Sequence, residues 1–592
     1  MSPPGKNLIM VSRREFLKYT AATVPATQLA ACGGGGDGSL EVVDWPIASA
    51  VYTTAEQQIC PVGLAANTPP LNANDLPYSL YGYNAWRPQP GLKHETLNAL
   101  APGYAGAPNV ARLLTFFSIS DIHIADKESP AQPLYFGWTA PWGAPSNDGS
   151  AYSPVILSTP HVLDAAIQTI NALHKRTPFD FGMSLGDAAN NTQYNELRWF
   201  IDVIDGKVIT PSSGDHLGAG TVDYQRPFKA VGLNKDIPWF QVIGNHDQFW
   251  SGSYCETTKT MAAHVGSTVL NMAAGNNSPT GGINGTGFYT GVVDGSTSLG
   301  LVIKSGPQDQ WIPAPQVAAD PDRRSLTTSL SSTANWMREF FNTTTMPVGH
   351  GFTRSNLDRD FACYSFQPKS GIPIKVIVLD DTMKGTGDQQ YARACLDKLR
   401  LEWLVAELEE GQRNDELMIV AAHIPVRPQQ TLAPDSNTFD LFVAPPSVVT
   451  DEKLLTILHG FPNLMLWMSG HRHINVISPQ PFNANDLSDQ PEGSFWEVET
   501  ASLRDFPQHL RTFDIRRNSD NTISIVVTNV DPAVSPRSPA ARSRDYAVGA
   551  SRIFNATSAS IGDATSQACN AVLVKQLTTR MQKVISAFGS PL

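Results

Sequence analysis

Six short apolar runs occupy the middle of the chain, and each run ends in polar residues. In order they are RLLTFFSISDIH, FDFGMSLGD, IPWFQVIGNHD, IKVIVLDD, LMIVAAHIP and NLMLWMSGHRH. Runs of this length, rich in Val, Ile and Phe, are typical of strands that are buried on both faces. Because such strands need cover from other elements, this pattern restricts the fold more than any other feature of the sequence.

Helical patterns lie between some of these runs. Residues 160–176 place Leu163, Ile167, Ile170 and Leu173 on one stripe, and residues 392–410 show the same spacing. Alternating strands and helices predict an α/β fold with layered sheets. Residues 511–530 predict a hairpin around the turn NSDN, and residues 567–588 have helical spacing.

Composition narrows the class of protein and its partners. The chain has 592 residues, of which 41% are hydrophobic, and a formal net charge of −11. A chain this long buries a large core, and its composition is that of a soluble globular protein. There is no basic run long enough for a nucleic-acid footprint, so we expect no binding to DNA or RNA.

The N-terminus predicts export. Arg13 and Arg14, followed by Phe16 and Leu17, resemble a twin-arginine signal, and the apolar stretch behind them is too short to span a bilayer. LAAC at residues 29–32 resembles a lipobox. We therefore expect the twin-arginine translocase as a partner, acylation of Cys32, and a lipid-anchored protein in the periplasm or at the cell surface. An ordinary secretory signal, with Cys32 incidental, is the alternative.

Composition shifts predict four segments. Residues 1–32 are the signal peptide, and residues 33–108 form a Gly-rich tether and an irregular stretch with few regular elements. Residues 109–515 form the main domain, which carries an insertion at about 251–370 that lacks strong periodicity. Residues 516–592 form an extension made of a hairpin and a helix.

The polar residues that end the apolar runs form a set with metal-binding chemistry. In chain order they are Asp121, His123, Asp187, Asn245, His246, His423, His471 and His473. Oxygen and imidazole ligands without thiolate suit Zn, Mn or Fe rather than Cu(I) or an iron–sulfur cluster. In open α/β sheets, ligands gather outside the carboxyl ends of the strands, so we expect one site. The set is too large for one ion, and two ions would share Asp187.

In this order the blocks DxH, GD, GNHD, H and GHxH, from residue 121 to 473, resemble the calcineurin-like metallophosphoesterases. FWEVETASLRDFPQ, residues 495–508, is similar to a stretch in exported bacterial members. The resemblance implies a four-layer αββα sandwich with large loop insertions. It also implies that Asp121, His123 and His473 hold one ion, that Asn245, His423 and His471 hold the other, and that Asp187 joins them.

The resemblance further implies a mechanism. A hydroxide bridging the two ions attacks phosphorus in line, His246 lies beside the substrate, and Asp247 holds the orientation of His246. Purple acid phosphatases carry a metal-binding Tyr three residues after the bridging Asp, but this chain has Asn190 there, which argues against an iron–tyrosinate centre. The two ions can be Mn, Fe or Zn.

The substrate stays open at this point. A small-molecule phosphomonoester is the first expectation, and a phosphodiester of a nucleotide or a phospholipid headgroup is the second. A third alternative is an inactive, surface-anchored protein that binds metal or phosphate. Arg472 is expected to be solvated, with a contact to substrate phosphate as the alternative, and the eight remaining histidines are expected to be surface or core residues.

Overall fold

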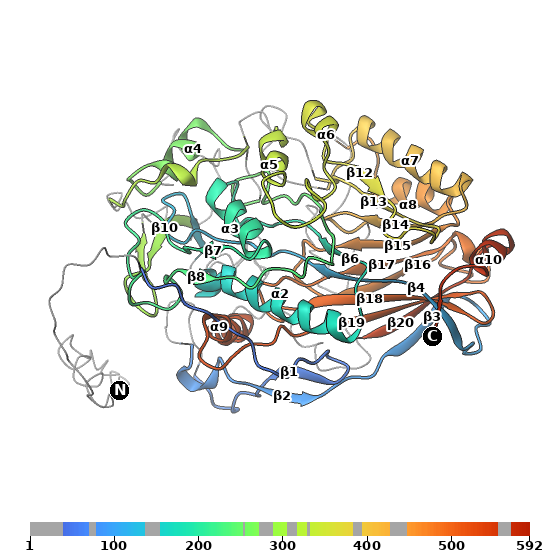
Figure 1. The fold of residues 1–592 in the computed structure, drawn as a ribbon, viewed down its shortest axis with the longest axis horizontal. Helices are drawn as coiled ribbons and strands as arrows, with labels where there is room; N and C mark the ends of the chain where they lie inside the picture. Colours follow the sequence, from blue (N-terminus) through green and yellow to red (C-terminus); the bar gives the residue numbers. More distant parts are fainter. Residues whose placement is uncertain are drawn as a thin grey trace, which may run out of the picture. The chain divides into compact units, whose positions relative to one another are not determined.

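The apolar runs form neighbouring strands of two sheets, as the sequence predicts (Figure 1). In a sheet with the order β3-β20-β19-β18-β4-β6-β9, strand β4 (Asn109–Ile119) pairs in parallel with β6 (Phe181–Ser184). Strand β9 (Trp239–Gln241) pairs in parallel with β6 on its other side, and the short β21 (Ser590–Pro591) pairs with β4. The carboxyl ends of β4, β6 and β9 therefore lie at one edge of this eight-stranded sheet.

The second sheet has six strands in the order β12-β13-β14-β15-β17-β16. Strands β13 (Ile374–Val378), β14 (Leu417–Ala421), β15 (Leu464–Ser469) and β17 (Phe495–Glu499) run parallel. The outer strands, β12 (Tyr364–Phe366) and β16 (Val476–Gln480), are antiparallel to their neighbours. Every residue of β13, β14, β15 and β17 is buried, which explains their continuous apolar runs.

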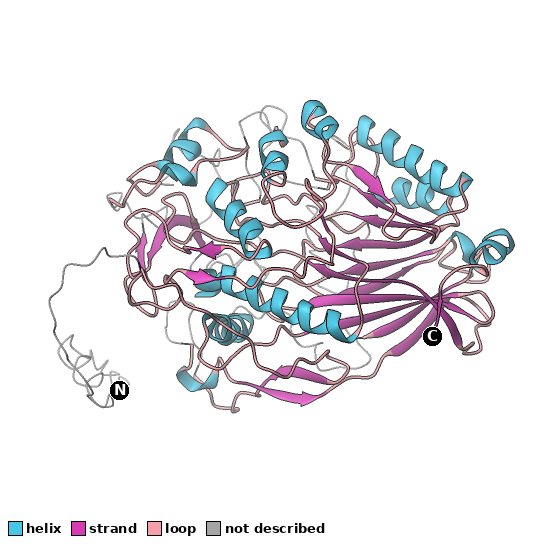
Figure 2. Cartoon of the chain, viewed as in Figure 1, coloured by secondary structure: helices cyan, strands magenta, loops and turns pink. Residues whose placement is uncertain are grey.

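Two of the three hydrophobic cores in the described part of the chain hold the two sheets and their helices together. The larger core joins Phe116 of β4 and Ile419 of β14, from different sheets, to Ile170 of α2 (Thr159–Arg176) and Phe200 of α3 (Tyr194–Ile204). A second core joins the six-stranded sheet to α7 (Lys398–Arg413) and α8 (Asp451–His459), with Trp467 buried among them. The protein is thus a mixed α/β structure in which strands and helices share cores (Figure 2).

The remaining elements are short and lie around these sheets. They are strands β1 (Gln57–Pro61), β2 (Trp86–Pro90), β5 (Pro133–Tyr135), β7 (Val208–Ile209), β8 (Phe228–Lys229), β10 (Phe288–Asp294) and β11 (Leu301–Lys304), helices α4 (Thr258–Val265), α5 (Ala334–Glu339), α6 (Arg354–Arg359), α9 (Pro539–Ile553) and α10 (Thr579–Ile585), and several 3-10 turns. Two of these strands, β10 and β11, and three of these helices, α4, α5 and α6, lie in the predicted insertion at 251–370, which also contains β12. The insertion is therefore more regular than its composition suggests, and its far end belongs to the six-stranded sheet.

The secondary structure near the two ends of the chain differs from the prediction. Residues 33–108 contain β3 (Glu95–Leu100), which pairs with β20 (Ala571–Lys575) in the eight-stranded sheet. The predicted hairpin is confirmed as β18 (Leu510–Asn518) and β19 (Ile523–Val530), but β18 also pairs along β4, so the hairpin is internal to this sheet and is not an extension. The final helical pattern is a strand followed by a helix, because its first half, AVLVK, completes the sheet.

This computed structural model describes residues 40–69, 78–135, 154–252, 255–270, 288–304, 316–327, 332–382, 394–426, 447–553 and 570–592. Residues Glu41–Leu592 form one compact unit. The predicted signal peptide, with Arg13, Arg14 and Cys32, lies outside the described residues. Within the described ranges, no helix combines the length and apolar character that a membrane crossing requires.

Candidate metal centre

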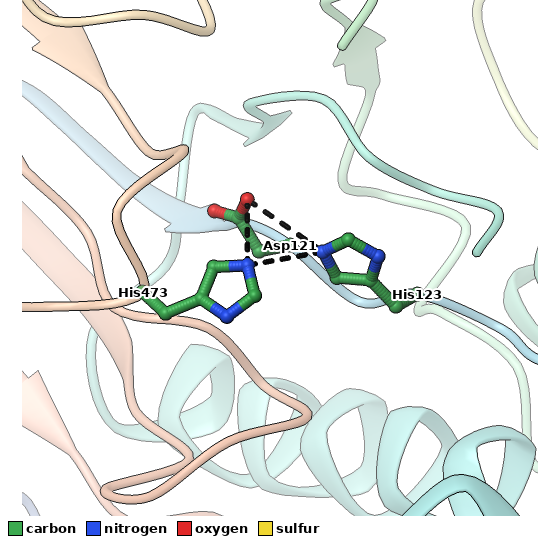
Figure 3. A group of neighbouring side chains, drawn as sticks. All are labelled: Asp121, His123 and His473. Atoms are coloured by element: carbon green, nitrogen blue, oxygen red, sulfur yellow. Dashed lines mark hydrogen bonds and ion pairs between the residues drawn. The ribbon is translucent and has the colours of Figure 1, made fainter. Parts of the chain in front are cut away.

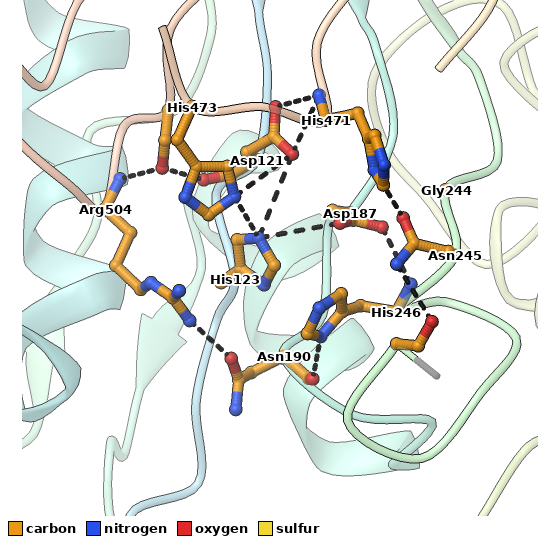
Figure 4. A network of polar contacts seen from close by, with 12 residues as sticks. Asp121, His123, Asp187, Asn190, Gly244, Asn245, His246, His471, His473 and Arg504 are labelled. Atoms are coloured by element: carbon orange, nitrogen blue, oxygen red, sulfur yellow. Dashed lines mark hydrogen bonds and ion pairs between the residues drawn. The ribbon is translucent and has the colours of Figure 1, made fainter. Parts of the chain in front are cut away.

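The predicted site residues come from the carboxyl ends of five parallel strands. Asp121 and His123 follow β4, Asp187 follows β6, and Asn245 and His246 follow β9 of the eight-stranded sheet. His423 follows β14, and His471 and His473 follow β15 of the other sheet. Figure 4 shows side chains from both sheets pointing toward one another, so the structure brings the predicted residues together at the strand ends.

Asp121, His123 and His473 form the first group (Figure 3). The Nε2 atoms of His123 and His473 are 3.1 Å apart, and Asp121 Oδ1 lies 3.4 Å from His473 Nε2 and 3.9 Å from His123 Nε2. Two imidazole nitrogens and a carboxylate oxygen that converge in this way are suitable metal ligands.

Asn245, His423 and His471 form the second group. Asn245 Oδ1 is 2.8 Å from His423 Nε2 and 3.1 Å from His471 Nδ1. The amide nitrogen of Asn245 donates to the carbonyl of Gly252 at 3.0 Å, so the amide oxygen is the atom turned toward the two histidines. One oxygen and two nitrogens are therefore directed at a common point.

Asp187 lies between the two groups. Its Oδ2 atom is 3.5 Å from His123 Nε2 in the first group and 3.3 Å from His423 Nε2 in the second. Its Oδ1 atom accepts a hydrogen bond from the backbone N–H of His246 at 2.8 Å, which fixes the carboxylate plane. Asp187 also belongs to possible metal-binding clusters with His123 and His246, and with Asp121 and His423.

The backbone beneath the site is held in an uncommon conformation. The φ angles of Asp121, His123, Asp187, His471 and His473 are all positive, between 47° and 74°. A left-handed conformation costs a residue other than Gly about 1–3 kcal/mol. The cost is offset by cross-loop bonds: the N–H of His123 donates to the carbonyl of Asp187 at 3.0 Å, and the N–H of His471 donates to Asp121 Oδ2 at 3.0 Å. These bonds direct several side chains inward from consecutive turns.

Two glycines make the close approach of these turns possible. A Cβ atom on Gly470 would lie 1.8 Å from Ser120 Oγ and 2.4 Å from Asp121 Oδ2. A Cβ atom on Gly244 would lie 2.1 Å from Asp187 Oδ1. Both glycines are therefore required by contact with a site carboxylate, which explains the Gly of the GHRH and GNHD motifs.

Hydrogen bonds to the ring nitrogens that face away from the site determine which ring nitrogen faces it. His423 Nδ1 lies 2.8 Å from the carbonyl of Leu185, which can only accept, so Nδ1 carries a proton and Nε2 is the nitrogen that faces the site. His473 Nδ1 lies 2.6 Å from Asp505 Oδ2 in the same way. His123 Nδ1 is buried with no hydrogen-bond partner among the described residues. This arrangement suits histidines that bind a cation through the ring nitrogens facing the site.

Burial and charge shift the pKa values of the site in opposite directions. Burial opposes ionisation of Asp187, but His423 and His246 outweigh it and hold the pKa of Asp187 well below its usual range. Burial also opposes the charging of His423 and His473. The carboxylates of Asp187 and Asp121 nevertheless raise the pKa of His423 to about 10, and Asp121 and Asp505 raise that of His473 to about 9. In the metal-free chain, protons thus compensate the buried carboxylates.

His246 lies at the site, but Asp247 does not hold its ring. His246 Nδ1 lies 2.7 Å from the carbonyl of Asn190, whereas the carboxylate of Asp247 accepts from the backbone N–H groups of Asp187 and Gly244 at 3.0 and 2.9 Å. These contacts do not support the expectation that Asp247 orients His246. The carboxylate of Asp247 accepts from three backbone amides instead, including that of Ala189 at 3.2 Å.

Arg472 also differs from its prediction. It is largely buried, and its Nε donates to Glu499 Oε2 at 2.7 Å while Nη2 bonds the other oxygen. This two-pronged pair of Arg472 with Glu499 ties the turn between His471 and His473 to strand β17, so Arg472 is neither solvated nor directed at a substrate. Sequence reasoning also missed Arg504 and Asp505, although both lie in the quoted motif FWEVETASLRDFPQ.

Replacing Gly470 by Ala should lower metal binding without unfolding the chain. The added methyl group would overlap Ser120 Oγ and displace the Asp121 carboxylate, so the metal content should fall clearly below that of the unchanged protein. The control is Gly63→Ala, where a Cβ meets nothing within 4 Å. Metal is measured by elemental analysis and the fold by circular dichroism; a fully loaded Gly470→Ala protein would contradict the arrangement.

Metal should stabilise the protein more as the pH rises. In the metal-free form, the raised pKa values of His423 and His473 contribute stability that is complete below the ordinary value of 6.5 and is lost as the pH rises through about 9 and about 10. Bound ions replace these protons. The melting temperatures measured with and without a chelator should therefore diverge between pH 7 and 9. All other titrating groups are common to both samples, so parallel curves of melting temperature against pH would rule out an exchange of protons for metal.

Comparison with known proteins gives a distant structural match. No family model matches the chain, and no curated protein matches it. Among solved structures, the crystal structure of a dimetal phosphatase from Danio rerio aligns with 72% of this chain and 100% of its own, at 10% identity and a TM-score of 0.34. A TM-score this low does not establish a shared fold, so a functional assignment depends on the site itself.

Proposed function

We propose that this chain is an exported phosphoester hydrolase that holds two divalent or transition-metal ions, Mn, Fe or Zn. The observation that carries the proposal is the position of Asp187 Oδ2, 3.5 Å from His123 Nε2 and 3.3 Å from His423 Nε2. A carboxylate between two groups of nitrogen and oxygen ligands is what a two-ion hydrolytic centre requires. The resemblance of the five ordered motifs supplies the substrate class.

The residues divide between the ions as the motifs imply. Asp121, His123 and His473 hold the first ion, and Asn245, His423 and His471 hold the second, with Asp187 shared. The donor set supports this division, because each group offers oxygen and imidazole nitrogen and neither offers a thiolate. The four-layer αββα sandwich is the arrangement we infer for the fold, supported by one core between the two sheets and a second beneath α7 and α8.

The chain's own groups prepare the site for an anionic substrate. Bound ions supply Lewis acidity and an activated water. Burial, together with the nearby Arg504, outweighs Asp187 and Asn190 and lowers the pKa of His246 to about 4, so the ring is neutral near pH 7. Nδ1–H of His246 donates to the Asn190 carbonyl, so Nε2 is left to face the substrate and can donate to a phosphoryl oxygen or a leaving group once it takes up a proton. A phosphate dianion beside it would favour the protonated ring.

A phosphomonoester is the substrate class we expect, with a diester of a nucleotide or phospholipid headgroup as the alternative. His246→Asn should keep both ions but lower kcat by about 10²–10⁴-fold, because it removes a proton-transfer group. Asp187→Ala should lose metal and activity together. The assay compares a nitrophenyl phosphate with a bis-nitrophenyl phosphate, with metal measured on the same samples.

The control for these variants is His216→Asn, which changes an exposed histidine that has a similar positive φ of 51°. It should leave kcat and metal content unchanged. If the wild-type protein hydrolyses neither substrate while Asp187→Ala still loses metal, the alternative of an inactive metal-binding or phosphate-binding protein is favoured. Full activity in both the His246 and the Asp187 variants would refute the two-ion scheme.

Export and anchoring through Cys32 are further parts of the proposal, supported by the twin-arginine and lipobox motifs. Cys32→Ser should move the protein from the membrane fraction to the soluble periplasmic fraction and abolish labelling by a fatty acid, because the variant has no thiol to acylate. Cys60→Ser, at an internal cysteine, serves as the control. Unchanged membrane association of the Cys32 variant would remove the lipid anchor from the proposal.

A further inference from the structure

Arg504 lies in the loop between β17 and β18, and this loop is fastened to the end of β4. The backbone N–H of Leu503 donates to the carbonyl of Ser120 at 3.1 Å, and Ser502 Oγ donates to the carbonyl of Asp121 at 2.7 Å. The backbone N–H of Arg504 donates back to Ser502 Oγ at 2.9 Å. Only 4% of Arg504 is exposed, so its guanidinium is held inside the protein beside the candidate metal centre.

One side of the guanidinium reaches toward His246. Arg504 Nη1 donates to Asn190 Oδ1 at 2.7 Å, and the backbone carbonyl of the same Asn190 accepts from His246 Nδ1 at 2.7 Å (Figure 4). Asn190 Nδ2 is in turn 3.3 Å from Gln132 Oε1, which agrees with the amide oxygen facing the arginine. Arg504 therefore bonds directly to the residue that holds the ring of His246.

The other side of the guanidinium reaches toward His473. Arg504 Nε and Nη2 each lie 3.3 Å from Asp505 Oδ2, and that same oxygen is 2.6 Å from His473 Nδ1. A carboxylate behind a metal-binding histidine fixes the tautomer and orientation of the ring. Arg504 thus contacts the group that directs His473 Nε2 at Asp121.

We propose that Arg504 is a positioning residue that couples the two ends of the site. It acts through two contacts, its two arms, one with Asn190 and one with Asp505. Through Asp505 it orients His473 toward the first ion, and through Asn190 it fixes the ring of His246 beside the substrate. A planar guanidinium can hold both partners at once because its donors diverge in a rigid fork, which the single ammonium of a lysine cannot reproduce. The coupling to turnover rests on the function proposed above, whereas the coupling to metal does not.

The test separates the two arms with substitutions in the full-length mature protein. Arg504→Ala should weaken binding of Zn²⁺, titrated against a chromophoric chelator, by about 10–100-fold at one of two sites, as loss of a ligand's supporting group does. With saturating Zn²⁺, the same variant should lower kcat at least tenfold with little change in KM. Arg504→Lys should restore neither property, since the charge remains but the fork is lost.

Double variants show whether the arms act as described. Arg504 and Asp505 act on the same histidine, His473. The double variant Arg504→Ala with Asp505→Asn should therefore lower the affinity for Zn²⁺ no more than the worse single change. Arg504→Ala with Asn190→Ala should likewise lower kcat no further than the worse single change. Arg198→Ala is the matched control, because Arg198 is also buried and paired but contacts Asp202 and Glu339 on helices away from the site.

The outcomes distinguish this inference from the proposed function. Weaker Zn²⁺ binding by Arg504→Ala in a protein that hydrolyses no phosphoester would support the positioning role and reject the function. A hydrolytic wild type whose Arg504→Ala variant keeps its Zn²⁺ affinity and kcat would do the reverse. Additive double variants, full recovery in Arg504→Lys, or equal losses in Arg198→Ala would overturn the positioning role, because each would indicate a general effect on charge or stability.

Discussion

The structure depends on the burial of two carboxylates, Asp121 and Asp187, where the carboxyl ends of parallel strands from the two sheets meet. Both side chains are almost fully excluded from water, and taking an isolated charge out of water is costly. The protein compensates them with His423 and His473, whose pKa values Asp187 and Asp121 raise. His123 lies 3.5 Å from Asp187 but adds no charge, because burial holds the pKa of its ring well below the usual value. The sheets, the strained turns and the close-packed glycines all serve to bring these opposite charges together.

This compensation is suited to exchange with metal. In the metal-free chain, raised pKa values of His423 and His473 supply positive charge, and an ion would take over that task when the protons leave. The strained backbone at the five left-handed residues means that the ligands do not depend on the ion alone for their orientation. The preorganised site is an argument for chemistry rather than for stability, because a stable core needs neither strain nor buried charge.

A second set of residues holds the site residues in place through hydrogen bonds. Glu499 holds Arg472 between two histidines, Asp247 gathers the backbone amides around Asp187, and the carbonyl of Leu185 sets the tautomer of His423. Each contact joins residues far apart in sequence. They explain why Asp247 and Arg472, which look like reactive groups when read as motif neighbours of His246 and His471, are parts of the scaffold.

Much of the candidate site was predictable from the sequence because strands end where ligands gather. Asp121, Asp187, Asn245, His423 and His471 each follow an apolar run, and parallel pairing brings such ends together whatever the details of the fold. The confirmed hairpin of β18 and β19 follows from local turn chemistry in the same way. The sequence by itself therefore determined the α/β class, the strands that carry the motifs, and which motif residues the strand ends bring together.

Only the tertiary structure decided what lies beside what. The pairing of β18 along β4 and of β20 with β3 depends on contacts between residues hundreds of positions apart, so a hairpin that looked like an extension became the middle of a sheet. The same is true of Arg504 and Asp505, which acquire a role only because their loop is bonded to the end of β4. Periodicity and motif order report local conformation and residue chemistry, whereas hydrogen-bond partners are set by the packing of the whole chain.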